Sequence, residues 1–125
     1  MRLGFVLALP VMAACDGAGT CVEVSSACTP EYPPSYDAVY ANTIATSCQL
    51  GGCHGGGSDA GGLALGESAA EAYEALRVDR WVIEGDAACS PMFVAIASGR
   101  MPPGDDLSAA EQCAVQQWID EGASP

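Results

Sequence analysis

Apolar side chains recur every three or four residues in four segments of the chain, and a serine precedes each segment. This spacing gathers the apolar groups on one face of an α-helix. Ser68 and Ser108 each open a capping box, in which a serine and the glutamate three residues later bond free backbone amides. Ser90 precedes a proline, which suits the first helical position. The expected helices cover residues 35–48, 68–77, 90–99 and 108–122.

Two loops separate these helices. Residues 51–62 are rich in glycine, so we expect no regular element there and a backbone that can approach a flat group closely. In residues 100–104, Pro102 and Pro103 favour an extended backbone. No segment alternates in the manner of a strand. The sequence therefore predicts one all-α domain over residues 35–123, with about four short helices.

The N-terminus has the pattern of an export signal. Arg2, the apolar stretch 3–12 and two small residues predict a signal peptide over residues 1–14. Met12–Cys15 resembles a bacterial lipobox, which implies that Cys15 is lipidated and anchors the chain on the periplasmic side of a bacterial membrane, inner or outer. An ordinary signal peptide is the alternative. Residues 15–34 are rich in Gly, Ser, Thr and Pro, and we expect them to form a flexible tether.

Composition narrows the function further. The chain has 16 acidic and 4 basic residues, a formal net charge of −12, and this charge argues against nucleic-acid binding. Large apolar side chains are few, whereas 7 residues are cysteine. A small domain of this kind needs disulfides, a metal or a cofactor to complete its core. Export permits disulfides.

Cys48, Cys53 and His54 form the most informative cluster. Two thiols that can add to haem vinyl groups, with a histidine directly after the second, are what a c-type haem attachment site requires. The usual spacer between the cysteines has two residues, and this chain has four. A zinc site completed by Cys89 or Cys113 is a weaker alternative. A plain Cys48–Cys53 disulfide in a haem-free module is another.

A low-spin haem iron also needs a sixth ligand, which is often a methionine thioether. Met101 lies in the stiff proline-flanked loop, where its side chain can be aimed at a ligand position. Met92 lies inside an expected helix beside Phe93, where packing in the core explains it better. Met101 is therefore the predicted ligand.

The order of these motifs resembles the class I cytochrome c fold. The likeness is greatest to small exported or lipoprotein domains of myxobacteria, in which the attachment segment often has this longer spacer. It extends over most of the chain after the tether, but each motif is short and only their combination is specific. The matching segments are Cys48–Gly56, Gly61–Leu63, Gly85–Asp86, Met101–Gly104 and Trp118–Ala123.

The resemblance implies a monohaem c-type cytochrome that carries single electrons and is not an enzyme. Cys48 and Cys53 would hold haem c covalently, and His54 and Met101 would be the axial iron ligands. A haem peroxidase is less consistent with the sequence, because Met101 would close the open iron position that a peroxidase needs. A haem-free, disulfide-stabilised lipoprotein module with the same fold is the alternative function.

The remaining sulfur and charged groups complete the expectations. Proximity in the chain and in the implied fold favours the disulfides Cys21–Cys28 and Cys89–Cys113, although four cysteines allow three pairings. Any redox protein partner would present a basic face to so acidic a domain. The side chains considered as donors to the haem propionates are Arg77, Arg80, Trp81 and Arg100.

Overall fold

Serine side chains cap three of the helices in the structure, a computed structural model that describes residues 21–125. Ser35, Ser68 and Ser108 accept hydrogen bonds from the backbone amides of the third residue after each. The predicted signal peptide and Cys15 lie outside the described residues. The helices are α1 (Tyr36–Val39), η1 (Tyr40–Cys48), η2 (Ala60–Gly62), α2 (Ala69–Val78), α3 (Pro91–Ala97) and α4 (Ala109–Asp120).

These bounds confirm the all-α fold and the four helical segments that the periodicity predicts, and no strand occurs within residues 21–125. The first segment is divided, because α1 continues directly into the π-helix η1, which ends at Cys48. Ser90 differs from the predicted cap. Its side chain is buried and bonds to Ile83 and Asp86 instead of capping α3.

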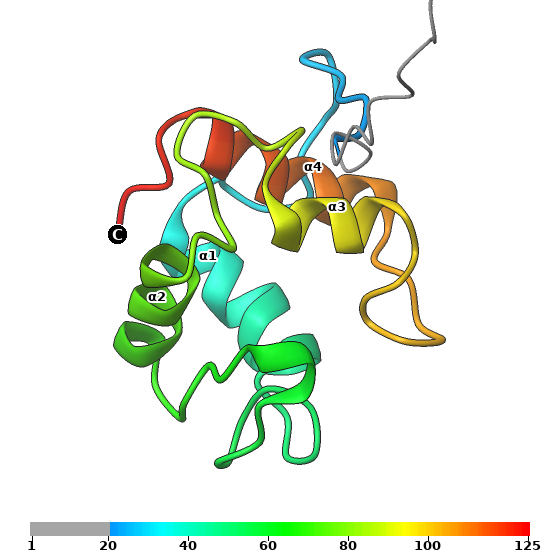
Figure 1. Cartoon of the computed structure of the whole chain (residues 1–125). Helices are drawn as coiled ribbons and strands as arrows, with labels where there is room; N and C mark the ends of the chain where they lie inside the picture. The colour runs from blue at the N-terminus through cyan, green and yellow to red at the C-terminus, as the bar shows by residue number, and fades with distance from the viewer. Residues whose placement is uncertain (1–20) are drawn as a thin grey trace, which may run out of the picture.

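The core forms where α1 and η1 meet α4, with α2 and α3 on either side (Figure 1). Tyr36 is its aromatic centre, with ring centroids 4.9 Å from Tyr73 and 5.4 Å from Trp118. Val39 and Ile119 are fully buried beside it. None of the helices in the described part of the chain combines the length and the apolar character needed to cross a membrane.

Residues 21–34, which we call the N-terminal strap, are fastened to the helical domain. Disulfides join Cys21 to Cys89 and Cys28 to Cys113. The predicted pairs Cys21–Cys28 and Cys89–Cys113 are therefore wrong. The strap runs along α4 and reaches the segment just before α3, so each of its cysteines meets a partner distant in sequence (Figure 1).

Hydrogen bonds fix the same segment. The backbone amide of Val22 donates to the Ala88 carbonyl at 2.8 Å, and that of Glu31 donates to Ala110 at 3.0 Å. Gln116, a buried side chain of α4, donates to the Ser25 carbonyl at 2.9 Å. The part of the predicted tether that the structure describes thus belongs to the domain, which begins at least 14 residues before Ser35.

Candidate functional site

A cavity of about 580 Å³ lies between the η1 side of the domain and the α3 side. This volume is within the range of sites that enclose small molecules and cofactors. Apolar side chains form most of its wall, among them Ile44, Leu63, Leu65, Leu76 and Ile96. The glycine-rich loop contributes Gly52 and Gly61, where the backbone itself faces the space. The cavity therefore suits a largely apolar ligand.

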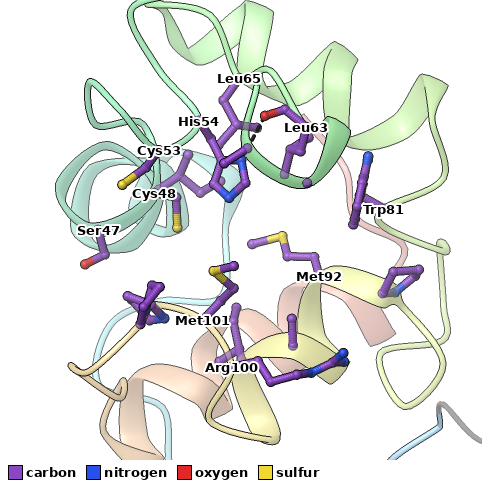
Figure 2. Close-up of a pocket in the computed structure, with 18 of the residues that line it drawn as sticks. Ser47, Cys48, Cys53, His54, Leu63, Leu65, Trp81, Met92, Arg100 and Met101 are labelled. Carbon is purple, nitrogen blue, oxygen red and sulfur yellow. Dashed lines mark hydrogen bonds between the residues drawn. The ribbon is translucent and has the colours of Figure 1, made fainter. Parts of the chain in front are cut away.

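Cys48, Cys53 and His54 all line this cavity, as Figure 2 shows. Both cysteines are free thiols, although the other four cysteines within residues 21–125 are paired. The π-helix η1 ends at Cys48, and a glycine-rich turn then returns the chain to Cys53, whose amide donates to the Leu50 carbonyl at 3.0 Å. The four-residue spacer thus still brings both cysteines to the wall of one cavity.

A backbone carbonyl orients the imidazole ring of His54. Its Nδ1 lies 2.8 Å from the Leu63 carbonyl, and because a carbonyl can only accept, Nδ1 carries the proton. Nε2 then has the lone pair and is the atom that can bind a metal. The Leu65 amide also donates to the His54 carbonyl at 2.7 Å, so both the ring and the backbone of His54 are held.

The side chain of Gln49 forms hydrogen bonds to residues on both sides of the Cys48–His54 segment. Its Nε2 donates to the carbonyls of Leu65 at 3.0 Å and Ser68 at 3.1 Å, and its Oε1 accepts from the Tyr40 hydroxyl at 2.7 Å. The end of η1 is thereby joined to the segment that orients His54. Sequence reasoning missed this role, because a glutamine between a cysteine and a leucine carries no motif of its own.

Two methionines face His54 from the opposite wall (Figure 2). Met101 lies there in the loop after α3. Met92, which the helical pattern assigns to the core, also lines the cavity, from the first turn of α3. Periodicity does not separate these two roles, since the wall of a buried cavity and the core present the same apolar helix face.

The predicted propionate donors divide into two pairs. Trp81 and Arg100 line the cavity. Arg77 instead forms an ion pair with Glu84 at 2.8 Å, and Arg80 lies with it beside a separate hollow. Arg77 and Arg80 are therefore not among the residues that face a ligand in the main cavity.

The zinc alternative loses its proposed fourth ligand. Cys89 and Cys113 are both in disulfides. Across residues 21–125, no three side chains of the His, Cys, Asp and Glu types come together in a way that would hold a metal ion. The donor set of this cavity is instead two thiols, one imidazole and two thioethers, which matches c-type haem attachment with histidine and methionine ligation.

No family model, curated protein or solved structure matches the chain. The likeness to class I cytochromes c thus depends on the segments quoted above and on the cavity to which they contribute.

Cys48 is partly buried, and we expect this to make its thiol a slow nucleophile as long as the cavity is intact. Desolvation, followed by the charge of Cys53, raises the pKa of its thiol to about 11, and the thiol lies 3.7 Å from the Thr43 carbonyl. A pKa of about 11 in place of 9.0 leaves roughly 100-fold less thiolate near neutral pH. In chain made without haem, we expect iodoacetamide to alkylate Cys48 about tenfold more slowly than in guanidinium, because the thiolate of higher pKa is rarer but also more nucleophilic. Peptide mass mapping separates it from Cys53.

The pH dependence supplies the control for this experiment. In the folded chain the rate at Cys48 should continue to rise past pH 9, whereas in the unfolded chain it should level off near its ordinary pKa of 9.0. Equal rates and equal pH profiles in the two states would contradict the burial of this thiol.

Proposed function

We propose that this chain is a monohaem c-type cytochrome domain, exported and lipid-anchored through Cys15, that carries single electrons. The observation that supports it most is the cavity itself. Two free thiols and an oriented imidazole lie on one wall, and two thioethers lie on the other. When bound, haem supplies an iron that gains and loses one electron.

Each of the cavity residues would have a distinct role in holding the haem. Cys48 and Cys53 would form the two thioether bonds to the vinyl groups. His54 would ligate iron through Nε2, with the Leu63 carbonyl holding its tautomer. Met101 would supply the sulfur ligand on the opposite side. The apolar wall would exclude water from the iron, which favours electron transfer over reactions with exogenous ligands.

The groups that line the cavity also suggest how the two propionates would be held. Among the described residues that line it, Arg100 is the one arginine, and the indole of Trp81 is a second donor. The negative charge of the chain, −12, favours a redox protein with a basic face as the electron donor or acceptor.

Intact mass tests this function directly. In protein produced with export and haem-attachment machinery, we expect the mass of one haem in addition to two disulfides, and a c-type α band in the reduced visible spectrum. Cys48→Ser with Cys53→Ser should abolish the covalent addition. Ser47→Ala, a neighbouring change in the same cavity wall that removes no thiol, should retain it.

The haem-free alternative predicts a different mass. Its cavity cysteines would form a third disulfide, and the protein would carry no added group. A wild-type protein of that mass, made under conditions that load a control cytochrome, would overturn the proposal.

A further inference from the structure

Met92 and Met101 are the two methionines in the part of the chain that the structure describes, and both line the one cavity. Their thioethers extend toward His54 from the same side in Figure 2. A single iron ligated by His54 needs only one of them. The second sulfur is therefore unexplained by the function proposed above.

The two side chains are held very differently. Met92 is 9% exposed, belongs to α3, and donates its amide to the Trp81 carbonyl at 2.9 Å. Three residues before it, Cys89 is fixed to the N-terminal strap by a disulfide. Both restraints hold the first turn of α3 at the cavity wall, so Met92 has little freedom to leave.

Met101 is attached more loosely. It is 37% exposed and follows α3 in the loop that leads to α4. Its amide donates to the Ala95 carbonyl at 3.0 Å, but the turn beyond it is closed by a longer contact of 3.4 Å from the Asp105 amide to Pro102. Local opening of an exposed loop costs less free energy than moving a packed helix. Met101 is thus the sulfur that can move away.

We propose that Met92 is a second thioether ligand, which binds the haem iron when Met101 leaves it. This inference depends on the proposed function. The bond from Met101 sulfur to iron breaks and the bond from Met92 sulfur forms. Both ligands are neutral, so no proton or electron is exchanged with the surroundings. Movement of the exposed loop would then change which sulfur is bound without opening the iron to water.

Leucine substitutions test the exchange, because leucine keeps most of the volume of methionine and removes its sulfur. Wild type, Met92→Leu, Met101→Leu and the double variant would be prepared with covalent haem. We expect Met101→Leu to remain low-spin, with the methionine-to-iron(III) charge-transfer band and a strongly shifted methionine methyl signal in NMR. The double variant should be high-spin and should bind carbon monoxide at least tenfold faster than the wild type.

Two outcomes would overturn the inference. The first is that Met101→Leu loses the methyl signal and resembles the double variant, which would leave Met92 a packing residue. The second is that Met92→Leu is high-spin while Met101→Leu is unaffected, which would make Met92 the only sulfur ligand. Circular dichroism and the two intact disulfides establish that each variant is folded. Absence of haem from the wild type is a separate result, because it contradicts the proposed function itself.

Discussion

Replacing Cys28 and Cys113 with alanine is expected to lower the free energy of unfolding by about 4 kcal/mol. The two cysteines are 85 residues apart in sequence. Because the Cys21–Cys89 disulfide remains in the variant, the loop that Cys28–Cys113 adds runs through it and has about 30 residues. Such a cross-link restricts the unfolded chain, and the restriction grows with the logarithm of loop length. Guanidinium denaturation of both proteins, at matched haem content, measures the difference.

The folded state adds to this expectation. The disulfide holds the N-terminal strap against α4, where Gln117 donates to the Cys28 carbonyl at 3.2 Å and Gln116 to Ser25. Cys113 is 2% exposed, so its removal also leaves space in the core. Alanine is preferred to serine there because a buried hydroxyl would need a hydrogen-bond partner.

A different disulfide pairing would give a different experimental result. If Cys28 were joined to Cys21, its disulfide would close a much shorter loop, for which the same relation gives about 2.5 kcal/mol. The double substitution would then also break the disulfide of Cys113. Non-reducing peptide mapping identifies the bonded peptides independently. A Cys21–Cys28 peptide in that map would contradict the structure.

The difference between the predicted and observed disulfides shows where sequence reasoning reaches its limit. Ser68 and Ser108 cap the helices that they predict, because a capping box depends on contacts within four residues. Cys21 and Cys28 are near each other in sequence, but their partners are set by the path of the strap past α4 and the segment that precedes α3. No local sequence pattern predicts the path of the strap, and composition alone predicts a flexible tether.

In the candidate site, too, some residues are placed by local sequence and others by long-range packing. Cys48, Cys53 and His54 lie within seven residues, so one short segment brings them to the cavity. Met92 and Arg77 depend on packing instead. The fold turns the Met92 face of α3 toward the cavity and leaves Arg77 beside Glu84. The helical period predicts a buried face without specifying what that face meets.

Gly55 is the position in the cavity loop where a single methyl group should have the largest effect. A Cβ atom there would lie 2.5 Å from the Gln49 carbonyl oxygen and 2.6 Å from its carbon. Both are backbone atoms, so no side-chain rotation relieves the contact. A hydrogen bond also holds the backbone of Gly55 in place, because its amide donates to the Leu50 carbonyl at 3.1 Å. Gly55→Ala should therefore force open the turn that follows η1.

We expect Gly55→Ala to cost about 3 kcal/mol of unfolding free energy, in the upper range of overpacking substitutions. Because Gly55 adjoins His54, the same change should displace the imidazole and lower the fraction of chain that carries covalent haem. Gly51→Ala is the matched control: it lies in the same loop, and a Cβ there meets nothing within 4 Å. Its cost should stay below about 1 kcal/mol. Denaturation midpoints and intact mass measure both effects, and similar losses in the two variants would show that the close packing of Gly55 against Gln49 does not shape the site.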